Sequence, residues 1–355
     1  MGMPSINISF KETAIASIER AERGIVALIL KEATLPTVNP LAIISAADIP
    51  SSISAANKKQ IELALMGYVK APKKVICYFV KQDETVEYTS AFTYFAHTGF
   101  DYMAIPTVET DGKTLEVSTW IKGQRTSGKM CKAVLPNTAG DNEGIINFTT
   151  ESIIATDGEY TTEQYCSRIA GLIAGTPLTI ACTFAPLPEV TDCTHLTAAE
   201  MDAAIDAGKF IIFYDGEKVK AGRGVNSLST TMGDKGADFK KIKIIEAMDM
   251  IYTDIKMTAQ DNYLGKYSNS YDNKCLLMSA ISGYFEQLII DGVLDAASIS
   301  IDIEAQRAYL KGTGVATDNM NDDEIKIYNT DSHVFLKATI NILDAIEDIA
   351  LVINI

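Results

Sequence analysis

The chain has 355 residues and a formal net charge of −15, with 47% hydrophobic and 22% charged residues. This length exceeds what one hydrophobic core usually fills, so we expect two domains or one domain with a large elaboration. The excess of acidic residues argues against nucleic acid as a partner, because a surface that neutralises phosphates needs clustered Lys and Arg.

The cysteines and the apolar runs indicate a protein of a reducing compartment. The six cysteines form no CxxC pair, and several lie inside apolar runs, where they are expected to be small buried hydrophobes. No apolar run approaches the roughly 18 residues that a membrane span needs. The amino end lacks the basic region and apolar core of a secretory signal. We therefore expect a protein made in a cytoplasm, with no direct membrane insertion.

The amino end alternates polar and apolar residues with the period of two that is typical of a half-buried strand. The residues of this predicted strand are Ile6, Asn7, Ile8, Ser9 and Phe10. No tight hairpin partner follows nearby in the sequence. The strand therefore has no evident partner within its own chain.

Strand-like and helix-like segments alternate in the next part of the chain. Strands are expected at 25–30, 41–45, 74–80, 102–105 and 131–135, and helices at 54–66, 86–96 and 115–123. Such alternation predicts parallel strands joined by crossover helices, which is a layered α/β domain.

The pattern becomes looser after residue 141. We expect a helix at 162–174, a strand at 177–188, and a strand at 209–217 with a hairpin partner at 223–228. Thr197 and Glu200 have the spacing of a capping box and predict the start of another helix. Gly, Asp and Lys are concentrated at 232–238, which predicts a loop or hinge between two lobes.

The remaining sequence predicts an α+β lobe. Its apolar stripes predict long helices at 239–263 and 273–290, and strands are expected at 299–303, 324–328, 333–343 and 349–355. The expected fold is a layered α/β lobe followed by an α+β lobe with two long helices, with extended N- and C-terminal β-strand arms. The expected boundaries are an N-terminal arm at 1–20, the α/β lobe at 21–230, the α+β lobe at 231–345 and a C-terminal arm at 346–355.

No catalytic, cofactor or metal site emerges from the sequence. The segment from Gly123 to Met130 resembles a phosphate-binding loop, but Met130 stands where Ser or Thr should hold Mg²⁺, and a helix precedes the loop instead of following it. The three histidines, His97, His195 and His333, lie far apart and have no ligands at metal-binding spacing.

Several segments of the second half of the chain stand out together by their order and spacing. They are Gly222–Ser229, Phe239–Ile244, the helix Ala247–Ile255, Tyr263–Asn269 and the helix end Gly292–Leu294. Through these segments the chain from Ala221 onward resembles the tail sheath proteins of contractile-tailed phages and phage-tail-like bacteriocins, in particular the compact Gram-positive prophage type. The resemblance extends upstream over Lys74 to Pro136 and covers nearly the whole chain.

The resemblance implies a structural subunit and not an enzyme, with no cofactor. Such a sheath polymerises around an inner tube and contracts to drive the tube through a target cell envelope. The implied partners are other copies of the chain in stacked hexameric rings, the inner tail tube protein, and the baseplate and tail terminator proteins. Assembly in a bacterial cytoplasm is implied, as part of a phage tail or a released bacteriocin particle.

The resemblance also gives the two terminal strands a destination, because in this family the arms add strands to sheets of neighbouring subunits. The expected inter-subunit strands are Ile6–Phe10 and the C-terminal residues Ile349, Leu351, Val352, Ile353 and Ile355. The expected receiving sheet contains Val334, Leu336, Ile340 and Ile342.

Charges on the first long helix are candidate contacts to the inner tube if they are exposed. They are Lys240, Lys241, Lys243, Glu246 and Asp249, and for each of them a solvated helix face is an equally good interpretation. Two alternative functions remain open at this point. One is a nucleotide-binding α/β enzyme, and the other is a different self-assembling tube, shell or surface-layer protein.

Overall fold

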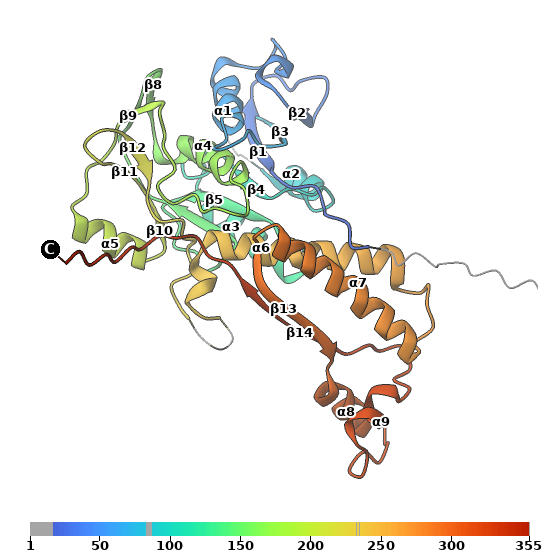
Figure 1. Ribbon diagram of the computed structural model, residues 1–355. Coiled ribbons are helices and arrows are strands. Elements are labelled where there is room, and N and C mark those ends of the chain that lie inside the picture. The colour runs from blue at the N-terminus through green and yellow to red at the C-terminus, as the bar shows by residue number, and fades with distance from the viewer. Residues whose placement is uncertain (1–16, 83–86, 232, 234, 355) are drawn as a thin grey trace, which may run out of the picture. The chain divides into compact units, whose positions relative to one another are not determined.

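The computed structural model describes residues 17–82, 87–231, 233 and 235–354 (Figure 1). The predicted N-terminal arm strand and Ile355 lie outside these residues. The described chain divides into two compact units. We call residues 21–253 and 343–354 the α/β unit, and residues 17–20 and 254–342 the ribbon unit. The division at 253 and 254 falls inside a helix, whereas the sequence pointed to the loop at 232–238.

A seven-stranded sheet forms the centre of the α/β unit (Figure 1). Its strand order is β10-β6-β5-β4-β1-β3-β2, and every neighbouring pair is parallel except β2 with β3. The strands are β1 (Ile25–Glu32), β2 (Leu41–Ile43), β3 (Lys74–Lys81), β4 (Tyr102–Ala104), β5 (Lys132–Pro136), β6 (Ile145–Phe148) and β10 (Lys209–Phe210). The predicted parallel α/β arrangement is confirmed, because runs such as 25–30 are covered on both faces.

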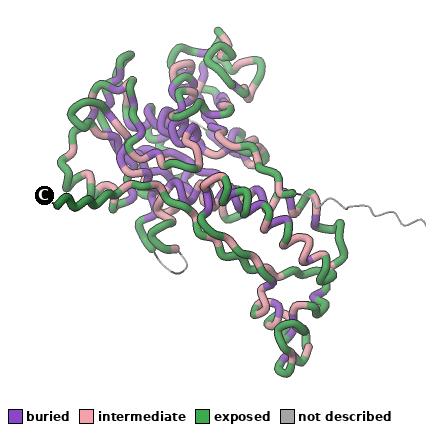
Figure 2. Tube along the Cα trace, viewed as in Figure 1, coloured by how far each residue is buried: buried purple, intermediate pink, exposed green. Residues whose placement is uncertain are grey.

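Helices cover both faces of this sheet. Its two faces hold separate apolar clusters, which lie in the buried centre of the unit (Figure 2). One cluster includes α1 (Ala55–Leu65) and α4 (Thr162–Ala174), and the other includes α2 (Thr89–Phe95) and α3 (Thr114–Thr126). A Cβ on Gly171 of α4 would lie 2.0 Å from the carbonyl oxygen of Ala64 in α1. Glycine at this position therefore allows the two helices to pack closely.

Polar side chains fix the starts of several helices. Thr197 Oγ1 accepts a hydrogen bond from the Glu200 amide at 3.3 Å, and Glu200 Oε2 accepts one from the Thr197 amide at 2.8 Å. This capping box begins α5 (Ala198–Asp206) and confirms the predicted N-cap. The Ser54 side chain caps α1, and Thr161 caps α4.

Two smaller sheets complete the strands of the α/β unit. The antiparallel sheet β8-β7-β9 consists of β7 (Ile153–Ala155), β8 (Gly158–Tyr160) and β9 (Val190–Asp192), and β11 (Ile212–Tyr214) pairs with β12 (Val219–Ala221). The expected strand at 177–188 is wrong, because these residues form turns with one isolated bridge at Pro186, and prolines remove ladder donors there.

The hairpin partner expected at 223–228 is also wrong. The partner is β12, because the Asp215 carboxylate accepts hydrogen bonds from the amides of Glu217 and Lys218, each at 2.9 Å, and closes a tighter turn. Side-chain hydrogen bonds of this type favour turns over continued strands.

A long helix runs through the boundary between the units. A short 3₁₀ helix (Ala237–Lys240) precedes α6 (Ile242–Thr258), which continues into a π-helical segment (Ala259–Tyr263). The predicted helix at 239–263 is therefore confirmed in outline. No helix within the described ranges is both long and apolar enough to cross a membrane.

The ribbon unit contains a helix, an antiparallel strand pair and an insertion between the strands. Its elements are α7 (Tyr271–Ile290), β13 (Leu294–Ile301), α8 (Ile303–Gly312), α9 (Asp322–Ile327) and β14 (Leu336–Ile342). The strand expected at 324–328 is wrong, since this segment is α9. The Asn321 side chain accepts from the Glu324 amide at 2.9 Å, and this cap starts a helix.

Candidate assembly surfaces

The pair β13–β14 is a two-stranded antiparallel ribbon with open edges. Its register pairs Leu294 with Ile342, Ala297 with Ile340, and Ile301 with Leu336. Among the described strands, neither β13 nor β14 has a second partner. Two strands alone are marginally stable, and unpaired edge groups are templates for another strand. The ribbon can therefore accept an added strand on either edge.

Three of the four residues predicted for a receiving sheet lie in this ribbon. Leu336, Ile340 and Ile342 belong to β14 and are half-buried, whereas the residues between them, such as Lys337 and Asn341, are exposed. Helix α7 packs against β13. Val334 precedes β14 and is exposed. The alternation gives the ribbon an apolar face and a polar face.

A buried lysine fastens the insertion between the ribbon strands to α7. Lys274 is 3% exposed, and its Nζ donates to Thr330 Oγ1 at 3.0 Å and more weakly to Gln306 Oε1 at 3.4 Å. Both acceptors are neutral, so burial lowers the pKa of Lys274. Asn269 also donates to Thr330 Oγ1, at 3.1 Å. This polar cluster holds the chain that leads into β14.

The segment that follows β14 is attached to the α/β unit by charged side chains. The Lys243 ammonium donates to the Leu343 carbonyl, and Lys241 pairs with Asp344. Further along, Glu347 accepts from the Thr183 hydroxyl. Arg223 Nη2 lies 2.6 Å from Asp348 Oδ1, and Arg223 Nε lies 3.4 Å from Glu347 Oε2. We call residues 343–348 the tail root.

The chain beyond the tail root is exposed and apolar. Ile349, Leu351, Val352 and Ile353 are 82%, 76%, 82% and 75% exposed, in a tail that Figure 2 shows as exposed, and the described tail contains no strand. Apolar side chains in a row are costly to leave in water, at about 25 cal/mol per Å². These residues match the predicted C-terminal arm in place, and their pairing with a neighbour stays a prediction.

The charges predicted to face a tube lie mostly in the interior. Lys132, at the start of β5, is 1% exposed, and its Nζ lies 2.8 Å from Glu246 Oε1 and 2.8 Å from Asp249 Oδ2. Arg125 makes two hydrogen bonds of 2.9 Å to Asp249. Tyr102 donates to Glu246 at 2.6 Å. These residues attach the first part of α6 to the sheet.

The charge states of this cluster follow from burial and pairing. Burial raises the pKa of Glu246, but Lys132 and Arg23 outweigh it and lower the pKa to about 2. Burial lowers the pKa of Lys132, but Asp249 and Glu246 outweigh it and raise the pKa. Glu246 and Lys132 are therefore both charged at neutral pH.

The expectation of exposed charges on this helix is wrong for three of the five residues. Lys243 and Asp249 are 7% and 5% exposed, and Glu246 has a side chain that is 15% exposed. Glu246 and Asp249 are inside because their ionic partners lie on distant segments of the same unit, and the buried Lys243 donates to the Leu343 carbonyl. Lys240 and Lys241 remain half-exposed, and Lys241 is engaged with Asp344.

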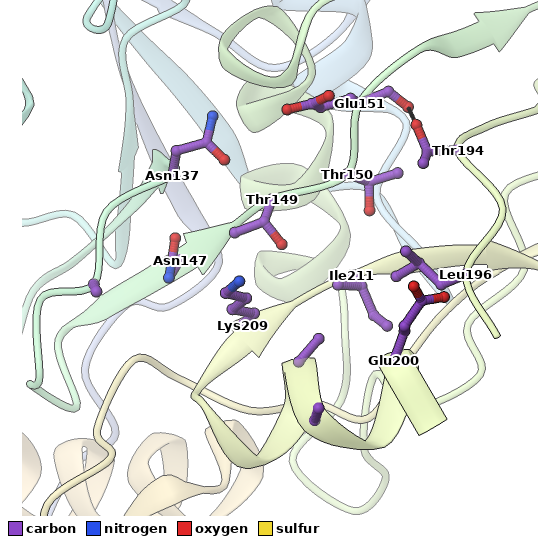
Figure 3. A pocket seen from close by; sticks show the side chains of 13 residues that line it. Asn137, Asn147, Thr149, Thr150, Glu151, Thr194, Leu196, Glu200, Lys209 and Ile211 are labelled. Atoms are coloured by element: carbon purple, nitrogen blue, oxygen red, sulfur yellow. Dashed lines mark hydrogen bonds between the residues drawn. The ribbon is translucent and has the colours of Figure 1, made fainter. Parts of the chain in front are cut away.

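A hollow of about 610 Å³ lies between α5 and the strands β10 and β6 at one end of the sheet (Figure 3). Asn147, Thr149 and Lys209 line it from the sheet side, and Glu200 lines it from α5. The Glu200 carboxylate is already engaged in the helix cap. The described lining contains no His, Cys or Ser, so this hollow offers no pairing of such a nucleophile with a His base.

The phosphate-loop-like segment and the potential metal ligands also provide no site for chemistry among the described residues. The segment from Gly123 to Met130 joins the end of α3 to the start of β5, so no helix begins where a phosphate would bind. Within the described chain, no group of three or more His, Cys, Asp or Glu side chains could hold a metal ion. The structural features that stand out are the ribbon edges and the exposed tail.

Comparison with known proteins gives matches along the whole chain. Residues 82–227 match the family described as phage tail sheath protein central domain, and residues 234–355 match phage tail sheath C-terminal domain. The chain is 39% identical over 355 residues to the tail sheath protein of Clostridium phage phiCD119, covering 98% of each chain.

Solved structures share the fold at low sequence identity. The sheath tail protein of Desulfitobacterium hafniense matches with a TM-score of 0.71 at 19% identity, over 84% of this chain and 94% of that one. The anti-feeding prophage helical sheath in its contracted state matches with a TM-score of 0.70 at 12% identity, over 100% and 99% of the two chains. The predicted mixed α/β and α+β class is thereby confirmed.

Proposed function

Because the chain belongs to the phage tail sheath protein family, we propose that its two terminal segments join neighbouring subunits by adding strands to the β13–β14 ribbon. The chain is a structural subunit of a contractile tail sheath. The family matches confirm the resemblance to tail sheath proteins that the sequence shows. The inter-subunit strands are the part of this function that our proposal adds.

The open ribbon is the observation that carries the proposal. Its two edges each present unpaired main-chain donors and acceptors among the described strands. Strand addition satisfies these groups without requiring particular side chains, and the alternation of Leu336, Ile340 and Ile342 sets the register. A neighbour's C-terminal strand on one edge and a neighbour's N-terminal strand on the other would give four strands.

The exposed tail supplies the second half of the argument. Ile349, Leu351 and Ile353 alternate along the tail, so one face of an added strand would be apolar. Burying such side chains stabilises each one by about 1.5–3 kcal/mol. The tail therefore gains free energy from pairing with a ribbon whose own face is apolar.

Further partners follow from this role as proposals. The subunits would form six-membered rings that stack helically around an inner tube protein, and end rings would meet baseplate and terminator proteins. Assembly would take place in the bacterial cytoplasm, and contraction would release free energy stored in the extended lattice while the strands stay paired. No bond is made or broken in this cycle, so we propose no enzymatic step.

The experiment replaces one residue of the tail. Leu351→Pro removes a ladder donor from the added strand and should leave folded subunits that form no long tubes. Leu351→Val is the matched control, since valine keeps the donor and favours strands. Sedimentation and negative-stain microscopy measure tube formation, and long tubes of the proline variant would overturn the proposal. A variant that lacks residues 1–12 tests the N-terminal arm in the same way.

A further inference from the structure

We propose that the tail root is a clamp that keeps the C-terminal strand from folding back onto β14 of its own chain, and so reserves that strand for a second copy. The inference rests on the proposed function, because it concerns which ribbon receives the strand. It assigns a role to a set of contacts that strand addition itself does not need.

Self-pairing is a real competitor because of the order of segments along the chain. Strand β14 ends at Ile342, and the apolar arm begins at Ile349. The short connection between them is close in length to the loops of ordinary β-hairpins. A short flexible connection gives an effective concentration in the range of about 1 mM. An unrestrained tail would therefore meet its own β14 far more often than a neighbour's ribbon.

A tail paired with its own β14 would block assembly in two ways. It would cover one edge of its own ribbon, which could then accept no neighbour. It would consume the arm, which could then reach no neighbour. A third strand makes a two-stranded ribbon considerably more stable, so this closed form would persist. A sheath subunit consequently needs a restraint against it.

The structure shows such a restraint at the connection itself. Residues 343, 344, 347 and 348 all contact side chains of the α/β unit, and the described tail forms no ladder with β14. A hairpin would need this same segment as its turn. As long as the tail root stays attached, the turn cannot form.

The contacts of the tail root differ in strength. The Glu347 side chain is 11% exposed and accepts from Thr183, with Arg223 beside it. The Lys243 ammonium is buried, so losing its acceptor at Leu343 would leave a buried donor unpaired. Asp348 is 83% exposed, and a pair so open to solvent contributes little. Glu347 and Lys243 are therefore the principal anchors.

The boundary of the clamp coincides with the start of the apolar arm. The last contact to the α/β unit is at Asp348, and every described residue from Ile349 onward is exposed. The root also contains an exposed apolar residue, Ile346 at 89%, but all charged residues of the segment lie in the root and the arm has none. The sequence thus separates the part that holds the tail from the part that pairs.

The test measures amide hydrogen exchange of residues 349–354 at a protein concentration below that of tube formation. In the wild type these amides should exchange rapidly. In the triple variant Arg223→Ala, Lys243→Met and Glu347→Ala, which removes both principal anchors, self-pairing should slow their exchange roughly tenfold, independently of protein concentration, and should reduce tube formation. Exchange as fast as in the wild type would overturn the clamp.

Further variants guard against misfolding and unspecific charge effects. Thr183→Val removes the hydroxyl that donates to Glu347 and accepts from the Gly224 amide at 2.9 Å, and it should slow exchange in the same direction to a smaller extent. In the background of Lys243→Met, the exchanged pair Arg223→Glu with Glu347→Arg should restore rapid exchange relative to the triple variant, and failure to do so in a folded variant would count against the clamp. Lys59→Ala removes a cation as exposed as Arg223 from its ion pair with Asp157, and it should leave tail exchange unchanged.

The two proposals fail on different readouts. The strand-addition proposal fails if Leu351→Pro still forms long tubes. The clamp proposal fails if the tail exchange of unassembled subunits is the same with and without the root contacts, whatever the tubes do. The failure of one proposal can therefore be distinguished from the failure of the other.

Discussion

The ammonium of Lys132 lies 2.8 Å from a carboxylate oxygen of Asp249, and the two residues are 117 positions apart in the chain. Both side chains are nearly inaccessible to water. Asp249 also receives two hydrogen bonds from Arg125. Charges from the sheet and from α3 thus hold the first part of α6 inside the α/β unit.

Replacing Lys132 with Met should destabilise the protein strongly. The change leaves Glu246 and Asp249 buried with fewer cations, and breaking a buried pair from one side costs about 3–5 kcal/mol. Urea unfolding of unassembled protein, followed by circular dichroism, measures the change in the free energy of unfolding. As a control, Lys113→Met removes a half-exposed pair with Glu116 and should change the midpoint little. Equal midpoints for the two variants would contradict this account of the cluster.

Replacing Lys274 with Met should change the pH dependence of stability. Burial lowers the pKa of Lys274 in the folded protein, so the charged form is penalised in the folded state at neutral pH. The penalty disappears as the pH rises from the lowered folded pKa past the unfolded value of about 10.4. The stability of the wild type minus that of the variant should therefore increase between pH 7 and pH 10.

Urea unfolding at several pH values measures that difference. Because both proteins share all other titrating groups, the difference isolates Lys274. Methionine fills a similar volume, so we expect the variant to lose at most about 1 kcal/mol at pH 7. A difference that stays constant from pH 7 to pH 10 would show that the folded protein does not penalise the charge.

Lys240 is the half-exposed charge for which we propose a contact with the inner tube. Unlike Lys241, it has no ion pair among the described side chains. Reversal by Lys240→Glu should reduce the amount of extended sheath that sediments with tubes, and the reduction should shrink at high salt. Lys129→Glu makes the same change of charge at an exposed loop elsewhere. If both variants sediment with tubes alike, Lys240 is not a tube contact.

The sequence predicted those parts of the fold whose signals are local. Helix α4 has the predicted bounds 162–174, because an N-cap starts it and an apolar stripe continues through it. The parallel sheet followed from apolar runs separated by helical segments. Helix α9 was missed although its signal was present, since Asn321 and Glu324 have capping-box spacing. Residues 324–328 also alternate polar and apolar side chains over their first four positions, a pattern that favours a strand.

In the candidate assembly surfaces, too, the features with a local sequence signal could be predicted and the contacts between distant residues could not. The exposed apolar arm and the strand β14 could be found from alternation alone. The ionic cluster could not, because helical periodicity places Glu246 and Asp249 on a face but does not reveal Lys132 opposite them. The tail root was missed for the same reason. Thr183, Arg223 and Glu347 come together only when the fold is complete.

The antiparallel pairing of β13 and β14 has a mechanical consequence. Hydrogen bonds between antiparallel strands run perpendicular to the strand axis. When an added strand is pulled along its own length, all of its hydrogen bonds are loaded in shear together, whereas a perpendicular pull would peel them apart one at a time. A lattice joined through this ribbon would resist tension along its threads far better than it resists being peeled open.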